Sequence, residues 1–268
     1  MKDKVVIITG ASSGIGLASA KAFAREGARL VLAARSIDKL HAIANEIDAS
    51  GEKCLAVKTD VTREEECKAL IQRTIDKYGK LDILVNNAGI SMRALLVDVE
   101  THVLKKVMDV NFWGTVYCTK YAIPFLQESK GTLVGISSIA GFHGLPGRTA
   151  YSASKFAMHG FLESVRIENM KSGVHVMVLA ASFTSSNIRK HALNEKGQEQ
   201  GETPKPEEKL TSPDRVARNL IRAIRKKKRT RIMSFEGQYM VLFQRIVPLL
   251  TDLVIYRKFA SEPNSPLK

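Results

Sequence analysis

A tyrosine and a lysine stand four positions apart in the segment YSASK, at Tyr151 and Lys155. If the segment is helical, the two side chains leave the same face about one turn apart. An ammonium beside a phenol stabilises the phenolate, so it lowers the pKa of a tyrosine from about 10 toward neutral pH. A tyrosine tuned in this way exchanges a proton with a ketone or alcohol oxygen. Taken alone, the same spacing also fits a solvated helix surface.

A glycine-rich segment near the N-terminus has the composition of a phosphate-binding turn. Residues 9–16 read TGASSGIG, between an apolar run and a segment of helical periodicity. Glycines let the backbone approach a ligand closely, and the free N–H groups of a helix N-terminus attract phosphate. A strand before the glycines and a helix after them favour a dinucleotide site over a simple tight turn. The residues expected to border the cofactor here are Gly10, Ser12, Ser13, Gly14, Ile15 and Gly16.

The end of the second apolar run indicates which dinucleotide is preferred. An acidic residue about 20 residues beyond the glycines usually binds the adenosine ribose of NAD(H). This sequence has Ala34 there, followed by Arg35. A guanidinium gains a charge-assisted hydrogen bond from a ribose 2′-phosphate but little from an uncharged ribose. The prediction is therefore NADP(H) as the cofactor, with a solvated charge at the strand end as the alternative for Arg35.

The surrounding pattern predicts the α/β fold that would position these residues. Continuous apolar runs alternate with helical periodicity, which is typical of a parallel sheet covered on both faces, with ligands at the carboxyl ends of its strands. We expect a doubly wound, Rossmann-like single domain with a C-terminal apolar helical extension. The expected strands are 5–8, 29–33, 54–57, 83–85, 132–136, 174–179 and 231–233. The expected helices are 16–25, 39–48, 63–78, 103–126, 154–170 and 213–226.

Six motifs in order carry a family resemblance. TGASSGIG at 9–16, Asp60-Val61, NNAG at 86–89, Asn111, Ser138 and YSASK resemble the short-chain dehydrogenase/reductase family in its single-domain branch, over residues 4 to about 180. The resemblance implies that Asp60 and Val61 hold the adenine ring. It implies that Asn86, Asn87, Ala88 and Gly89 border the cofactor and stabilise the central sheet. It also implies that the catalytic residues are Asn111, Ser138, Tyr151 and Lys155, the last two also lying at the cofactor.

The chemistry of these residue types agrees with the resemblance. A ketone that accepts a hydride develops negative charge on its oxygen and needs a proton. We expect the Ser138 hydroxyl to orient the carbonyl and share that charge, and Tyr151 to supply the proton. We expect Asn111 to anchor a water that relays protons to Lys155. Of the six tyrosines, only Tyr151 has a lysine four residues later.

One segment departs from the family pattern. The family commonly has Pro-Gly after the sixth strand and a threonine a few residues on, whereas this chain has Ala181-Ser182 and then Ser186. Proline fixes φ and glycine permits unusual conformations, so the exchange bears on the pocket wall and on cofactor affinity. Residues 182–213 are expected to form a mobile substrate loop or lid that contains a short helix.

Composition restricts the class of protein. The chain has 268 residues, 44% hydrophobic and 25% charged, which is typical of a soluble globular protein. No signal peptide precedes the first apolar run, no stretch is long enough to span a bilayer, and three scattered cysteines show no metal spacing. We therefore expect a cytoplasmic protein with no metal site.

Much of the net charge of +14 lies late in the chain, in residues 222–231. A basic helix end complements the helix dipole, and no recognition module or interleaved aromatic residues suggest nucleic acid as a partner. The apolar residues 240–256 are expected to form one amphipathic helix, with polar pairs at Gln244-Arg245 and Thr251-Asp252. This tail either packs on the domain, caps the substrate pocket, joins another subunit, or lies on a membrane surface with the basic run, over residues 222–258.

Together these features predict an NADPH-dependent oxidoreductase that reduces a hydrophobic ketone or oxidises the matching secondary alcohol. Family analogy alone suggests a 3-ketoacyl, ketosphingoid or steroid-like substrate. The competing hypothesis is a noncatalytic NADP-binding sensor or membrane-associated scaffold. We expect residues 1–235 to form the dinucleotide-binding and catalytic domain and residues 236–268 to form an amphipathic extension. The resemblance also implies a homodimer or homotetramer built on the helices that hold Asn111 and Tyr151.

Overall fold

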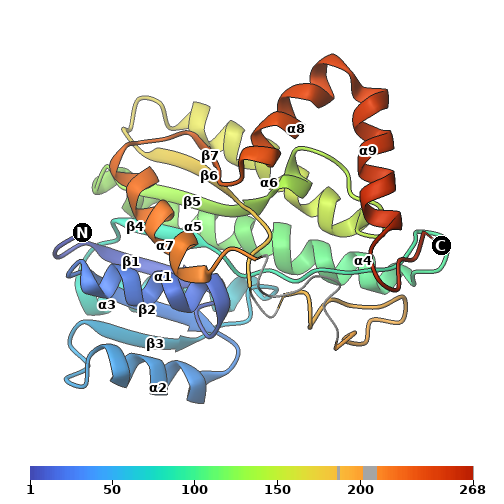
Figure 1. Ribbon diagram of the computed structural model, residues 1–268. Coiled ribbons are helices and arrows are strands. Elements are labelled where there is room, and N and C mark those ends of the chain that lie inside the picture. The colour runs from blue at the N-terminus through green and yellow to red at the C-terminus, as the bar shows by residue number, and fades with distance from the viewer. Residues whose placement is uncertain (186–187, 202–209, 268) are drawn as a thin grey trace.

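The computed structural model describes residues 1–185, 188–201 and 210–267, and a parallel sheet of seven strands runs through its centre (Figure 1). The strands are β1 (Val5–Thr9), β2 (Arg29–Ala34), β3 (Cys54–Lys58), β4 (Ile83–Asn86), β5 (Thr132–Ser138), β6 (His175–Ala181) and β7 (Thr230–Ile232). Their order in the sheet is β3-β2-β1-β4-β5-β6-β7, and every neighbouring pair is parallel. The predicted α/β fold is confirmed.

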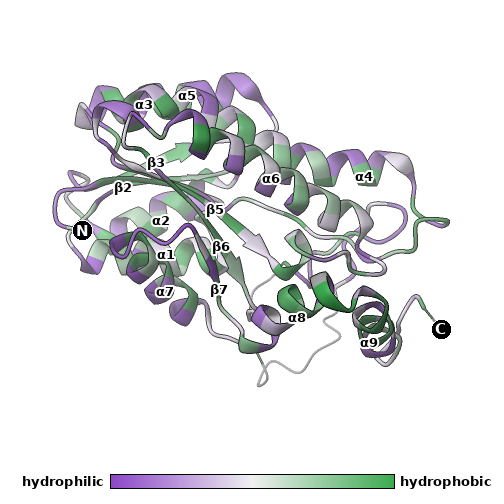
Figure 2. Ribbon diagram, turned by 90° about the horizontal axis from the view of Figure 1, so that it is seen from above, coloured by the Kyte–Doolittle hydropathy of each residue, from purple (hydrophilic) through white to green (hydrophobic). Residues whose placement is uncertain are grey.

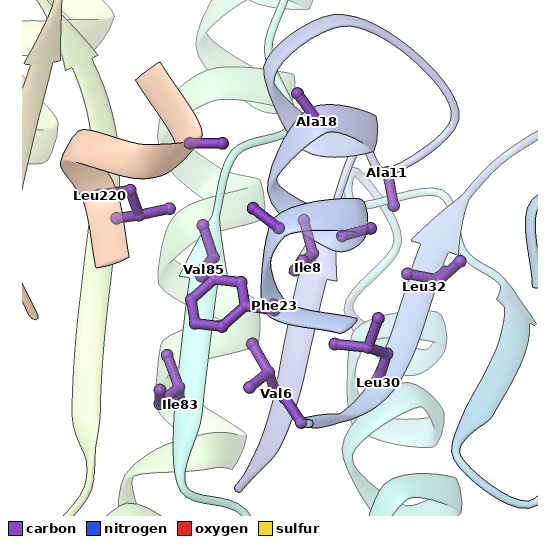
Figure 3. Close-up of a cluster of buried hydrophobic side chains, with 14 of the residues drawn as sticks. Val6, Ile8, Ala11, Ala18, Phe23, Leu30, Leu32, Ile83, Val85 and Leu220 are labelled. Atoms are coloured by element: carbon purple, nitrogen blue, oxygen red, sulfur yellow. The ribbon is translucent and has the colours of Figure 1, made fainter. Parts of the chain in front are cut away.

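Helices cover both faces of the sheet, as Figure 2 shows. One face carries α1 (Gly14–Arg25), α2 (Ile37–Ile47) and α7 (Pro213–Arg225). The other carries α3 (Glu64–Tyr78), α5 (Gly114–Glu128) and α6 (Thr149–Glu168), with α4 (Thr101–Met108) preceding α5. In Figure 3, Phe23 of α1 lies against Val6 and Ile8 of β1 and Val85 of β4, all fully buried, which fixes α1 over the centre of the sheet.

The loops after β1 and β4 are tied together where the strand order reverses. The Asn87 Nδ2 donates to the carbonyl of Thr9 at 2.8 Å. The Thr9 Oγ1 in turn accepts hydrogen bonds from the backbone N–H groups of Asn87 and Ala88, both at 3.0 Å. In open α/β sheets this reversal point at the carboxyl ends of the strands is where ligands bind.

The predicted helix over 103–126 is interrupted. Between α4 and α5 the residues Asp109–Trp113 form a π-helical turn that contains Asn111. Turns of this kind occur often at functional sites, because one extra residue per turn re-aims side chains. Helical periodicity alone does not reveal the extra residue, so the sequence predicted one continuous helix.

The C-terminal extension forms two helices, so the prediction of one helix over 240–256 is wrong. Helix α8 (Phe235–Ile246) and helix α9 (Pro248–Ala260) form a hairpin. Pro248 has no N–H to donate and disfavours helical backbone at the residue before it, and Val247 accordingly adopts φ −134° and ψ 66°. Among the described residues, no helix is long and apolar enough to cross a membrane.

The segment 182–213 contains isolated bridges in its described part, pairing Thr184 with Thr211 and Met92 with Leu193. The short helix expected there is absent from residues 182–185, 188–201 and 210–212. The role of a substrate lid and the domain division at residue 235 stay predictions.

Candidate active site

The glycine-rich turn packs so closely on the loop after β4 that a side chain is excluded at Gly10 and at Gly16. Gly10 and Gly14 have φ values of 65° and 53°, the left-handed region that favours glycine. A Cβ on Gly10 would lie 2.9 Å from the Ala88 Cα, and a Cβ on Gly16 would collide with the Gly10 carbonyl oxygen. The N-terminus of α1 follows directly, so the turn and the helix fit the phosphates of a dinucleotide. Ser13 is exposed at the N-cap, where its hydroxyl does not cap the helix, and Ser12 and Ile15 are partly buried.

The residues predicted to bind the adenosine half of the cofactor follow β2 and β3. Arg35 is exposed immediately after β2. Oδ1 of Asp60 accepts from the N–H and the hydroxyl of Thr62 at 3.0 and 2.8 Å, so the carboxylate is fixed in the turn after β3. Val61 is buried against Gly114 at the start of α5. The sheet order places the turn after β2 next to the glycine-rich turn and the turn after β3 one strand further away. The binding of the adenosine half by these residues stays a prediction.

The Asn111 amide joins the segment after β4 to α6. Its Oδ1 accepts from the Ile90 N–H at 2.8 Å, and its Nδ2 donates to the Ile90 carbonyl at 3.0 Å and to Ser154 Oγ at 2.9 Å. A Cβ on Gly89 would lie 3.2 Å from the Asn111 Oδ1 and 3.7 Å from the Lys155 Nζ. Asn111 and Lys155 therefore both border Gly89, although the proton relay through Asn111 stays a prediction.

Ser138 and Tyr151 meet at the carboxyl end of β5. Ser138 is the last residue of the strand, and its hydroxyl accepts from the Ala140 N–H at 3.2 Å. Tyr151 lies in the first turn of α6. Burial raises the pKa of Tyr151, while a hydrogen bond with Ser138 and the positive charge of Arg148 act in the opposite direction. The phenol therefore remains protonated at neutral pH, as a proton donor requires.

Lys155 is buried one turn after Tyr151 on the same helix. Its Nζ lies 5.8 Å from the centroid of the Tyr151 ring and donates to the Ile136 carbonyl at 2.9 Å. Burial lowers the pKa of Lys155 to about 8. The two side chains lie one turn apart on α6, as the spacing predicts. The expectation that Lys155 lowers the pKa of Tyr151 is not met, because burial raises that pKa and the opposing contributions come from Ser138 and Arg148.

Comparison with known proteins decides the family. The model of the short chain dehydrogenase family matches residues 4–197. The chain belongs to this family. Among its relatives, the 11-beta-hydroxysteroid dehydrogenase-like protein 4A of Arabidopsis thaliana is 41% identical over 73% of this chain and 66% of its own length.

Solved structures of two further proteins agree with the fold of this dehydrogenase. An alcohol dehydrogenase of Thermococcus sibiricus, complexed with 5-hydroxy-NADP, is 27% identical, with a TM-score of 0.74 over 87% of this chain and 95% of its own. A 3-ketoacyl-(acyl-carrier-protein) reductase of Brucella melitensis, complexed with NADH, is 26% identical, with a TM-score of 0.76 over 87% and 97%. The family is one of oxidoreductases that act on CH–OH and C=O groups.

A buried ionic cluster lies beside Tyr151 of the dehydrogenase, and the sequence did not predict it. The Arg148 Nη2 lies 3.2 Å from Glu262 Oε2, and Glu262 also pairs with Arg93 at 3.8 Å. The Arg148 Cζ stands 4.7 Å from the Phe259 ring. The available signal was a cation three residues before Tyr151, a spacing that brings it to the same helix turn. The cluster also fixes the C-terminal residues against the site.

The Ala181-Ser182 pair of the dehydrogenase lies beside Ser138, because Ala181 pairs with Ser138 in the register of β5 and β6. The Ser182 hydroxyl is hydrogen-bonded to Thr211 Oγ1 at 2.8 Å, and the Ser182 carbonyl accepts from the Thr184 hydroxyl at 2.8 Å. The Ser182 hydroxyl therefore fastens this segment to Thr211, before α7, through a bond that a glycine at position 182 would lack. Ser186 lies outside the described residues.

Proposed function

We propose that this dehydrogenase is an NADPH-dependent reductase of hydrophobic ketones and that it oxidises the matching secondary alcohols in reverse. The grouping of Ser138, Tyr151 and Lys155 beside the glycine-rich turn carries the proposal. Bound NADPH would supply the hydride. The glycine-rich turn and the N-terminus of α1 would hold its phosphates, because the free N–H groups of a helix N-terminus attract phosphate.

The side chains of the site divide the remaining work. The Ser138 hydroxyl would donate to the substrate carbonyl and hold it against Tyr151. The Tyr151 hydroxyl would give its proton to the oxygen as negative charge develops there. Lys155 would return a proton toward the site, because its pKa of about 8 lets it exchange protons near neutral pH. Asn111 would hold the segment after β4 against α6 through its bonds to Ile90 and Ser154.

The surroundings of Tyr151 support a hydrophobic substrate. Its ring packs between two apolar clusters, one containing Met92 and Val107 and the other containing Leu145 and Phe259. The names of the relatives add steroids and 3-ketoacyl groups as substrate classes to test. Ketosphingoid bases are a third class, because they carry a ketone on a long apolar chain as 3-ketoacyl groups do. Loss of NADPH absorbance with a panel of such ketones tests the proposal. Tight NADPH binding with no turnover of any ketone would instead favour the noncatalytic sensor.

Arg35 is proposed to select the 2′-phosphate of NADPH. Arg35→Ser is expected to weaken NADPH binding roughly 10- to 100-fold and to leave NADH binding nearly unchanged, because hydrogen bonds to charged groups contribute about 1.5–3 kcal/mol. Fluorescence titration with both nucleotides measures the change. Arg218→Ser, at an exposed arginine on α7, is the control and should alter neither affinity. Equal weakening for both nucleotides would contradict the role given to Arg35.

Arg148 and Glu262 are expected to shift the pH dependence of alcohol oxidation in opposite directions. This direction of the reaction needs the deprotonated Tyr151, whose pKa the positive charge of Arg148 lowers. Arg148→Gln removes that charge, so the pH at which alcohol oxidation becomes faster should rise. Glu262→Gln removes the negative charge that partly neutralises Arg148, so the same pH should fall. Profiles of kcat/KM against pH measure both, and shifts of the same sign would indicate a structural effect only.

Association through α5 and α6 is proposed as well. Trp113, just before α5, and Phe156 on α6 are exposed aromatic side chains on this face. Exposed apolar patches often mark contacts between subunits. Light scattering of the purified chain tests whether two or four copies associate.

A further inference from the structure

The hairpin of α8 and α9 carries most of the large hydrophobic side chains that are exposed in the described chain. Of the eighteen large hydrophobic side chains exposed in the described residues, eleven lie between residues 235 and 256. The most exposed are Leu249 at 75%, Phe235 at 72% and Ile246 at 66%. The others are Tyr239, Leu242, Phe243, Val247, Leu250, Leu253, Val254 and Tyr256. Figure 1 shows the hairpin projecting from the body of the molecule, and a soluble chain rarely leaves so large an apolar surface uncovered.

The opposite side of the same hairpin faces the candidate active site. Phe259 of α9 is buried against Ala140 and Leu145 in the segment after β5, and Tyr151 packs on this cluster. A Cβ on Gly237 of α8 would collide with the side chain of Ile139, the residue after Ser138. The hairpin is therefore fixed on its inner side, next to the proposed catalytic residues, and uncovered on its outer side.

Charge and side-chain type favour a lipid surface over a second copy as the occupant of the outer side. The net charge of +14 draws the protein to an anionic surface. Arg257 is exposed on α9, and the exposed Arg231 lies in β7, four residues before α8. The basic residues 226–229 lie at the other, amino end of β7, where the carbonyl of Lys228 bonds to His175, so they add to the net charge and not to the charge at the hairpin. Phe235, Tyr239 and Phe243 contact one another in series along α8, with ring centroids 4.6 and 6.3 Å apart. Aromatic side chains beside lysine and arginine are typical of the boundary between lipid and water.

We infer that the outer side of α8 and α9 docks this protein on the surface of an anionic lipid bilayer, and that apolar ketones reach the active site from that bilayer. The docking stands independently of the reaction. The delivery of ketones rests on the function proposed above.

Sedimentation with vesicles of phosphatidylcholine and phosphatidylserine at low salt tests the docking. The variant Leu249→Ser/Leu250→Ser/Leu253→Ser removes exposed leucines from the hairpin. The matched control Leu96→Ser/Val97→Ser removes side chains that are 61% and 86% exposed elsewhere on the surface. The parent and the control should pellet with the vesicles, and the triple variant should partition at least about tenfold more weakly. A parent that stays in the supernatant, or a triple variant that pellets as the parent does, overturns the docking.

Two further measurements separate this inference from its rivals. If light scattering shows that the triple substitution converts a dimeric parent to a monomer and vesicle binding is unchanged, the hairpin joins subunits and the docking is overturned.

Turnover is then compared for a ketone dissolved in the vesicles and a ketone dissolved in water. The triple variant should lose turnover only with the ketone in the vesicles. Equal rates with the vesicle-borne ketone for parent and variant overturn the delivery. A parent that pellets but reduces neither ketone overturns the delivery and the proposed function, and leaves the docking supported.

Discussion

Replacing Tyr151 by phenylalanine is expected to lower kcat/KM about 10²- to 10⁴-fold in both directions of the reaction, the usual contribution of a positioned proton donor. The ring keeps its place on the cluster of Leu145 and Phe259. The substitution therefore removes the hydroxyl and its hydrogen bond with Ser138 and leaves the packing of the site in place. NADPH affinity should change little, because the glycine-rich turn that would hold the phosphates is untouched. NADPH absorbance measures turnover, and fluorescence titration measures binding.

Tyr121→Phe is the matched control for this substitution. The Tyr121 hydroxyl donates to Glu64 Oε1 at 2.8 Å, between α5 and α3 and away from Ser138. Its replacement removes one hydroxyl and one hydrogen bond, as the substitution of Tyr151 does, and turnover should match the parent. If Tyr151→Phe kept the turnover of the parent, Tyr151 would not be the proton donor. If both variants lost turnover equally, a general loss of structure would explain the result.

The grouping of the candidate site was predictable because each of its parts lies within one short segment. The glycines of residues 10–16 follow β1, Asn87 follows β4, and Ser138 ends β5. Parallel strands in alternation with helices place all their carboxyl ends at one edge, so the fold alone brings these segments together. The spacing from Tyr151 to Lys155 then needed only a helix, and α6 supplies it.

Features that depend on contacts between distant segments were not predictable in this way. The ion pair of Arg148 with Glu262 joins residues 114 positions apart, and no periodicity points to it. The π-helical turn at Asn111 coincides with bonds from its amide to Ile90 and Ser154, which only the folded chain brings near. Pro248 is present in the sequence, but the apolar pattern continues on both sides of it and by itself predicts one helix, whereas the missing N–H divides the segment into two. Local patterns thus predicted the elements and the site, and tertiary contacts decided how the site is enclosed.

The second large effect is expected from Gly16→Ala, which should abolish NADPH binding and lower the free energy of unfolding by about 1–3 kcal/mol. The added Cβ would collide with the Gly10 carbonyl oxygen and lie 2.7 Å from the Asn87 Nδ2. The Gly10 carbonyl is backbone, and the Asn87 amide is bonded to the Thr9 carbonyl at 2.8 Å, so neither group moves without shifting its loop. Separation of the loops after β1 and β4 would open the turn that is proposed to hold the phosphates.

Gly160→Ala provides the comparison, because a Cβ at this position in α6 would meet nothing within 4 Å. Alanine is favoured over glycine inside a helix, so this variant should gain about 0.5–1 kcal/mol and bind NADPH as the parent does. Urea unfolding and fluorescence titration of NADPH measure both variants. A Gly16→Ala variant that binds NADPH with the affinity of the parent would show that the loops accommodate a side chain. The tight contact of the glycine-rich turn with the loop after β4 would then not be what shapes the cofactor site.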